Sequence, residues 1–268
     1  MALTNEQIEA AAVALETAER ERRQIRPISI EYPDMSLADS YAVQEAWLRL
    51  KLGSGRSLRG RKIGLTSRAM QLAMQIDEPD FGFLLDDMFF EDGSSIEAAR
   101  FTDPRVEVEL AFVLGRRLEG AALSVWDVLD ATDYVVPALE LIAARSHRID
   151  PETGRPRTIL DTVADNAASA GVVLGGRPIR PMDVDLRRVG ALLFRNGIIE
   201  ETGVSAGVLN HPANGIVWLA RRLSEHGVAL EAGQIVLAGS FTRPVAIAAG
   251  DTFHADFGEL GSIACSFS

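Results

Sequence analysis

The chain of 268 residues contains 27 Lys and Arg residues against 38 Asp and Glu residues, so its formal net charge is −11. An acidic chain of this kind has no surplus of cations for nucleic-acid phosphates, so we expect no nucleic-acid partner. The hydrophobic content of 47% and the charged content of 24% are typical of a globular protein with a sizeable core.

Two further features bear on the cellular location. The single cysteine, Cys265, cannot form an internal disulfide, and the polar N-terminus lacks the pattern of a signal peptide. The longest stretch free of Asp, Glu, Lys and Arg, residues 202–220, contains Asn, His and Pro, which excludes a membrane span there. We therefore expect a cytoplasmic protein with no membrane partner.

The beginning of the chain is predicted to be helical. Thr4 and Gln7 form a capping box before apolar residues at helical spacing, which predicts a helix to about residue 23. Residues 25–33 are expected to be extended, Ser36 caps a second helix that ends near Gly53, and residues 67–75 are expected to form a third. We divide the chain into an N-terminal helical region, residues 1–77, and a β-rich catalytic domain, residues 78–268.

Strand patterns dominate the second region. Residues 106–114 alternate and are rich in strand-forming side chains, and Asn196-Gly197 between apolar runs predicts a two-residue hairpin. Residues 134–142 form another strand, which Pro137 restricts to an edge, a bulge or a bend. Other strands are predicted over 62–65, 171–174, 234–238, 252–257 and 262–267, with helices over 124–131 and 214–223. The fold class is therefore α+β.

Three glutamates in apolar strands stand out. Glu107 and Glu109 are two residues apart, so they share one strand face and their side chains can converge on a divalent cation such as Mg²⁺ or Mn²⁺. The alternative is an acidic outer face of a half-exposed strand. Glu140 is the only charge between residues 133 and 145, so it needs a metal or a buried ion pair, for which Arg105 and Arg145 are candidates.

Polar residues in three other segments are candidates for catalysis or substrate binding. Lys62 lies in an apolar strand that opens into a turn. There it either acts as an acid–base group, holds an anionic substrate, or is an ordinary lysine at a sheet edge. Asp80 lies between Pro79 and Gly82 in a predicted loop, as an active-site group or as a turn-stabilising residue. The turn 239–244 offers hydroxyl groups and a guanidinium that can hold a carboxylate, or it is an ordinary connection.

Taken together, these segments resemble a known family. The stretches GRKIGLTSRAMQ, EPDFGFLLDDM, PRVEVELAFVL, ATDYVVPALELI, NHPANGIVWLA and AGQIVLAGSFTRP are similar to the hydratase/decarboxylase branch of the fumarylacetoacetate hydrolase superfamily. The resemblance implies a helical N-terminal part followed by a mixed β-sandwich or β-roll body, assembled into a homo-oligomer. It also implies Mg²⁺, or Mn²⁺, held by Glu107, Glu109 and Glu140, with Lys62 and Asp80 as catalytic groups.

The same resemblance implies a reaction. The loop 146–162 and the ending GSFTRPV are most similar to members that hydrate an unsaturated 2-oxo dicarboxylate from aromatic ring cleavage. Ser240, Thr242 and Arg243 are then substrate-binding, and Arg243, or less favourably His147 or Arg148, would hold the distal carboxylate. The alternatives are a 4-oxalocrotonate-type decarboxylase, a 2-hydroxypentadienoate hydratase, an acylpyruvate hydrolase, or a non-catalytic partner subunit.

Overall fold

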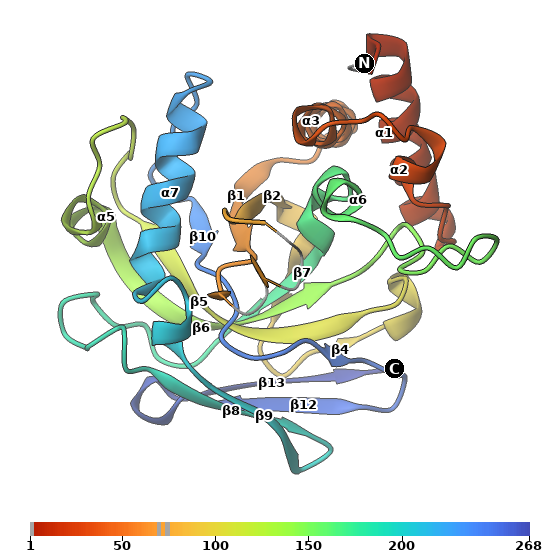
Figure 1. Cartoon of the computed structure of the whole chain (residues 1–268). Coiled ribbons are helices and arrows are strands. Elements are labelled where there is room, and N and C mark those ends of the chain that lie inside the picture. Colours follow the sequence, from red (N-terminus) through yellow and green to blue (C-terminus); the bar gives the residue numbers. More distant parts are fainter. Residues whose placement is uncertain (1–2, 69–70, 73–75) are drawn as a thin grey trace.

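The computed structural model describes residues 3–68, 71–72 and 76–268. Its helices precede and flank two β-sheets, as expected for an α+β protein (Figure 1). The α-helices within the described residues are α1 (Asn5–Glu21), α2 (Ile28–Glu31), α3 (Leu37–Gly53), α5 (Val125–Ala131), α6 (Ile159–Ala164) and α7 (Pro212–Ser224).

The strands form a large mixed sheet and a small sheet. The large sheet has the order β2-β1-β10-β5-β6-β7-β3, with β11 beside β5, and the small sheet has the order β4-β13-β12-β8-β9. The strands are β1 (Leu58–Gly64), β2 (Asp80–Leu85), β3 (Phe89–Glu91), β4 (Ser95–Ile96), β5 (Arg105–Leu114), β6 (Thr132–Ile142), β7 (Ser169–Leu174), β8 (Gly190–Arg195), β9 (Ile198–Val204), β10 (Ile235–Leu237), β11 (Val245–Ala246), β12 (Thr252–Asp256) and β13 (Ser262–Phe267).

The large sheet is covered on both faces, with α1, α3 and α6 over one face and the small sheet against the other (Figure 1). Alternate residues of β5 therefore enter different cores. Val108 and Leu110 pack in the core shared with the small sheet, whereas Ala111 packs in the core under the N-terminal helices. Burying side chains of the size of Val108 and Leu110 contributes about 1.5–3 kcal/mol each, so β5 is held mainly through its face toward the small sheet.

Several local predictions are confirmed. Thr4 caps α1 and Ser36 caps α3, each in a capping box. The hairpin between β8 and β9 turns at Asn196 and Gly197, whose φ angles of 53° and 80° are those of a two-residue turn with both central residues left-handed.

One local prediction is wrong, and one alternative of another is excluded. Residues 25–33 are not extended throughout, because they contain the single-turn helix α2. Of the edge, bulge or bend predicted at Pro137, the edge is excluded, since β6 lies between β5 and β7 in the middle of the sheet. The last pair with β7 is Ala138 with Leu174, so the missing N–H of Pro137 lies just beyond that ladder, where no partner strand needs it.

The proposed division after residue 77 stays a prediction. The strand β1, which precedes that division, pairs with β2 and with β10, both of which follow it. The helix predicted over 67–75 includes residues 69–70 and 73–75, which lie outside the described residues.

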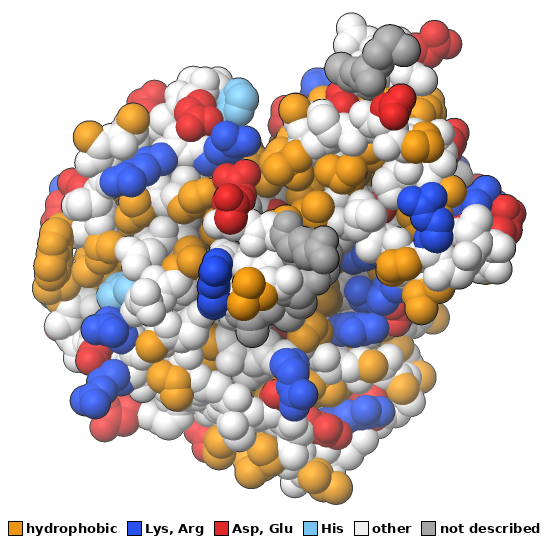
Figure 2. All heavy atoms as spheres, in the orientation of Figure 1, with side chains coloured by type: hydrophobic (Ala, Val, Ile, Leu, Met, Phe, Trp, Pro, Cys, Tyr) orange, Lys and Arg blue, Asp and Glu red, His pale blue; other side chains and the backbone are white. Residues whose placement is uncertain are grey.

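The surface carries both signs of charge. Acidic and basic side chains are interspersed over the face drawn in Figure 2, which shows no continuous basic patch. In the described part of the chain, no helix has the length and apolar character needed to cross a membrane.

Candidate metal and substrate site

Three carboxylates meet on the helix-covered face of the large sheet. Glu107 and Glu109 share one face of β5, and Glu140 on β6 lies directly opposite Glu107 in the antiparallel register. One carboxylate oxygen from each of the three lies within 4.8 Å of the other two. We call Glu107, Glu109 and Glu140 the glutamate cluster. Glu109 and Glu140 are buried and Glu107 is half-buried. The alternative prediction, that these glutamates form the acidic outer face of a half-exposed strand, is therefore wrong.

Burial and mutual repulsion disfavour three charges at this place. Burial, followed by the charge of Glu140, raises the pKa of Glu107 to about 7. The same two causes raise the pKa of Glu109 well above its ordinary value. A group of carboxylates that repel one another in a buried place is stabilised by a cation.

The positively charged side chain of Lys62 lies next to the glutamate cluster. Its Nζ lies 3.2 Å from Oε2 of Glu140 and donates to the carbonyl of Ala167 at 3.1 Å. Lys62 is not at a sheet edge, because β1 lies between β2 and β10. Burial would lower the pKa of Lys62, but the charges of Glu140, Asp80 and the neighbouring glutamates outweigh it and raise that pKa. Neither arginine candidate pairs with Glu140; Arg145 pairs with Asp165 instead.

Asp80 stands beside Lys62 on the neighbouring strand. It is the first residue of β2 and is buried, so the prediction of a loop position is wrong. Burial raises its pKa, partly offset by Lys62, and its Oδ1 has no hydrogen-bond partner. Gly64 lies opposite Asp80 in the register, and a Cβ added to Gly64 would come within 2.1 Å of that Oδ1. The glycine therefore leaves room for the carboxylate.

The glutamate cluster fits a hard divalent cation. All three side chains offer oxygen, the ligand that Mg²⁺ and Mn²⁺ prefer. Both carboxylate oxygens of Glu140 are buried with no hydrogen-bond partner, which leaves acceptors for an ion. Lys62 brings one positive charge to three carboxylates, so a divalent ion would balance the remainder.

A cavity of about 680 Å³ adjoins this site; Glu140 is not part of its wall but contacts Lys62, which is. Its wall includes Lys62, Asp80, Glu107 and Glu109, together with the loop from Ser240 to Pro244. The geometry therefore brings together the predicted metal-binding, catalytic and substrate-binding residues. Of the two other candidates for the distal carboxylate, Arg148 lines the cavity, whereas His147 is not part of its wall.

The loop after β10 is tied to β5. The backbone N–H of Gly239 donates to Oε2 of Glu109 at 2.8 Å, and the N–H of Val108 donates to Oγ1 of Thr242 at 3.2 Å. The hydroxyl of Ser240 donates to the carbonyl of Thr242 at 2.9 Å. The Arg243 side chain is 82% exposed and forms an ion pair with Glu201 at 2.8 Å.

A left-handed segment forms part of the cavity wall. Asn166, Ala167 and Ala168 all have positive φ, between 48° and 62°, which is unusual for residues other than glycine. The side chain of Asn166 holds this segment on β2, since it accepts from the N–H of Phe83 at 2.7 Å and donates to its carbonyl at 3.0 Å. The segment thereby presents the Ala167 carbonyl to Lys62.

Sequence reasoning missed several residues of this wall. The carbonyl of Ala167 leaves no trace in the side-chain pattern. Arg105 precedes Glu107 by two residues, so its place on the same strand face is predictable. Arg157 lies in a polar loop of the sequence, and only the fold brings it to the cavity.

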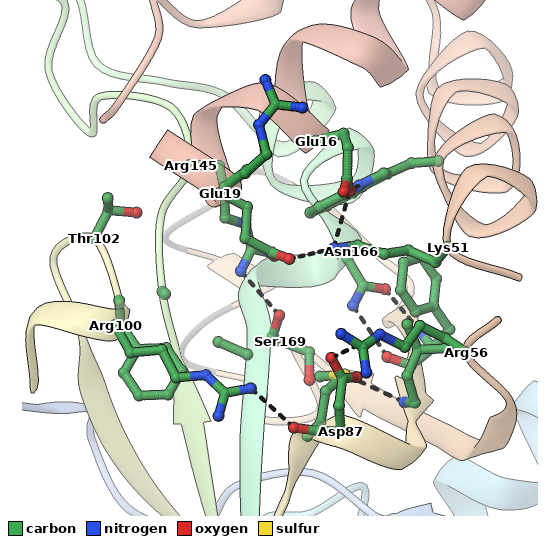
Figure 3. Close-up of a pocket in the computed structure, with 18 of the residues that line it drawn as sticks. Glu16, Glu19, Lys51, Arg56, Asp87, Arg100, Thr102, Arg145, Asn166 and Ser169 are labelled. Atoms are coloured by element: carbon green, nitrogen blue, oxygen red, sulfur yellow. Dashed lines mark hydrogen bonds and ion pairs between the residues drawn. The ribbon is translucent and has the colours of Figure 1, made fainter. Parts of the chain in front are cut away.

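A second cavity of about 270 Å³ lies on the other side of that segment, beneath α1 and α3 (Figure 3). None of the predicted site residues lines it. All three of its glutamates and aspartates pair with cations of its own wall: Glu16 and Glu19 with Lys51, and Asp87 with Arg56. The larger cavity is therefore the candidate active site.

Comparisons with known proteins agree with this geometry. Residues 54–268 match the family model described as fumarylacetoacetate (FAA) hydrolase C-terminal. The chain is 62% identical to 2-oxo-hept-4-ene-1,7-dioate hydratase of Escherichia coli, over 96% of both chains. It is 41% identical to 2-keto-4-pentenoate hydratase of Paraburkholderia xenovorans (strain LB400), over 99% of this chain and 96% of the relative.

A solved structure has the same fold. The 4-oxalocrotonate decarboxylase from Pseudomonas putida G7, complexed with magnesium and adipate, matches with a TM-score of 0.94 and 34% identity. The match covers 99% of each chain. The family model, the relatives and this structural match lead to one conclusion: the chain belongs to the fumarylacetoacetate hydrolase family.

Proposed function

We propose that the protein is a metal-dependent lyase that adds water to 2-oxohept-4-ene-1,7-dioate, giving 4-hydroxy-2-oxoheptane-1,7-dioate, in the breakdown of aromatic ring-cleavage products. The observation that carries this proposal is the 62% identity to a hydratase named for that substrate. The geometry of the glutamate cluster supports it, because a 2-oxo acid offers two oxygen atoms to a divalent cation. The intact cluster argues against a non-catalytic partner subunit.

Glu107, Glu109 and Glu140 would hold Mg²⁺, with Mn²⁺ as the alternative. When bound, the ion supplies Lewis-acid polarisation of the 2-oxo group and so favours proton loss from the adjacent carbon. The solved relative that holds magnesium supports the same ion for this chain.

Lys62 and Asp80 would carry out the proton transfers. The Nζ of Lys62 has three hydrogens and donates one to the Ala167 carbonyl, so even beside its ion-pair partner Glu140 it keeps a donor for the 2-oxo acid. The free Oδ1 of Asp80 is able to accept a proton from C3 and to return one to C5, which moves the double bond from C4–C5 to C3–C4, in conjugation with the ketone. Water then adds its hydroxyl at C4 while C3 is protonated.

Ser240, Thr242 and Arg243 would border the bound substrate. Their loop is fixed to β5 next to the glutamate cluster, through Gly239 and Thr242. The loop also forms part of the cavity wall.

The product identifies the reaction. Purified protein with Mg²⁺ and 2-oxohept-4-ene-1,7-dioate is expected to yield a product that is heavier than the substrate by one water. Mass spectrometry measures the mass of the product. A product lighter by one CO₂ would show the decarboxylase instead, and an unchanged substrate would contradict both.

We also propose a cytoplasmic homo-oligomer. Ile198, Ile199 and Val204 on β9 are at least half exposed, an apolar surface that association would cover. Light scattering on the purified protein should give a mass that is a multiple of 29.0 kDa. A mass of 29.0 kDa across the accessible concentrations would contradict this expectation.

A further inference from the structure

The wall of the active-site cavity carries several arginines. Arg105, Arg148 and Arg157, here called the arginine group, line the same cavity as Glu107 and Glu109 of the glutamate cluster. They come from three separate segments: the start of β5, the loop after β6 and the loop before α6. The fold therefore gathers cations that the sequence keeps apart.

Nearby carboxylates neutralise this group only in part. Arg148 pairs with Asp103. Arg157 lies 3.4 Å from Asp165, but Asp165 is shared with the fully buried Arg145. In the described part of the chain, no carboxylate pairs with Arg105. The arginine group thus keeps positive charge that an anion in the cavity would balance.

Within the arginine group, Arg105 has a hydrogen-bond donor that lacks a partner. Its Nε is buried and has no hydrogen-bond partner, which is costly for a charged donor and rare unless a ligand supplies the acceptor. Arg105 shares a strand face with Glu107 and precedes it by two residues, which separates their backbones by about 6.6 Å. An extended seven-carbon dicarboxylate spans a similar distance, about 7–8 Å, between its end carbons, from bond lengths near 1.5 Å.

Arg243 is less suited to that role. Its side chain is 82% exposed, whereas that of Arg157 is 9% exposed. It also has a carboxylate partner, Glu201. Charge-assisted hydrogen bonds strengthen where water is excluded, so the buried end of the cavity is the better place for a carboxylate.

We propose that Arg105, supported by Arg157, binds the distal carboxylate of a dicarboxylate whose 2-oxo end lies at the glutamate cluster. The proposal rests on the proposed function, since it assigns the second end of the same substrate. Arg105 is then the residue that makes the site prefer a diacid to a monoacid.

Direct binding tests the subsite without requiring turnover. Adipate and hexanoate have the same length and differ in one carboxylate, and each is titrated into the Mg²⁺-loaded protein by calorimetry. Adipate should bind about 10–100-fold more tightly, the range of one charge-assisted hydrogen bond. Equal affinities in the unmodified protein would overturn the proposal, whatever reaction the enzyme catalyses.

Variants assign the effect to a residue. In Arg105→Met the adipate-to-hexanoate ratio should fall about 10–100-fold, and the ratio of kcat/KM for the heptenedioate over 2-oxopent-4-enoate should fall in parallel. Arg188→Met, on an exposed loop outside the cavity, is the matched control and should keep both ratios. Loss of the ratios in Arg243→Met with retention in Arg105→Met would overturn the proposal. If Arg105→Met does not fold, Arg105→Lys replaces it and should reduce the same ratios.

The test separates the two proposals. If no water is added to any substrate but adipate still binds through Arg105, the subsite stands and the hydratase proposal fails. If water is added but Arg105→Met keeps its diacid preference, the hydratase proposal stands and the subsite fails.

Discussion

Replacing Glu107 by Gln is expected to abolish stoichiometric binding of Mg²⁺ or Mn²⁺ and to lower kcat/KM by at least about 10³-fold. The substitution keeps the size of the side chain and removes one of the three carboxylate ligands. Lewis-acid stabilisation is worth several kcal/mol, and about 1.4 kcal/mol corresponds to a factor of ten. Calorimetric titration with Mn²⁺ measures the binding, and product formation measures the turnover.

Glu200→Gln is the matched control for this substitution. Glu200 lies on β9, where it is exposed and outside the cavity, so this variant should bind one Mn²⁺ per chain with wild-type affinity. The Glu107→Gln protein should remain folded, because removing one of several repelling carboxylates relieves strain in the metal-free cluster. Unchanged turnover in Glu107→Gln would show that the cation is held elsewhere.

Replacing Lys62 by Met should lower kcat by about 10²–10⁴-fold, the usual contribution of a positioned proton-transfer group. Methionine fills a similar volume but has no N–H for the Ala167 carbonyl or for the substrate. The three glutamates remain, so the variant should still bind one divalent ion. Kinetics at saturating substrate, together with Mn²⁺ titration, separate loss of chemistry from loss of the ion.

Lys51 is the only other lysine in the chain and provides the control. It pairs with Glu16 and Glu19 at the second cavity, away from the glutamate cluster. Lys51→Met should therefore keep kcat even if it lowers the free energy of unfolding. A Lys62→Met enzyme within about threefold of wild-type kcat would refute the assignment of Lys62, given the range expected for such a group.

Much of the site could be predicted because β-strands have a period of two. That period alone places Glu107 and Glu109 on one face of β5 and the apolar Val108 on the other, as the structure has it. A single charged residue in an otherwise apolar strand can also be recognised in the sequence, and this is how Glu140 was identified. The capping boxes and the Asn196-Gly197 hairpin were predictable because they depend on neighbouring residues.

The remaining features depend on register and on contacts far apart in the sequence. Nothing in the sequence indicates that Glu140 faces Glu107 rather than a residue two positions away, since register is set by whole strands. The ion pair of Lys62 with Glu140 joins residues 78 positions apart, and the sequence offered two arginines that are nearer along the chain. The position of Asp80 within a strand was missed because its flanking proline and glycine are also typical of loops.

Removal and restoration of the metal test the central claim most directly. Protein stripped by a chelator and supplied with 2-oxohept-4-ene-1,7-dioate should leave the substrate mass unchanged. Addition of about one equivalent of Mg²⁺ per chain should then yield the product that is heavier by one water. Addition of water at an undiminished rate by the metal-free protein would contradict the account.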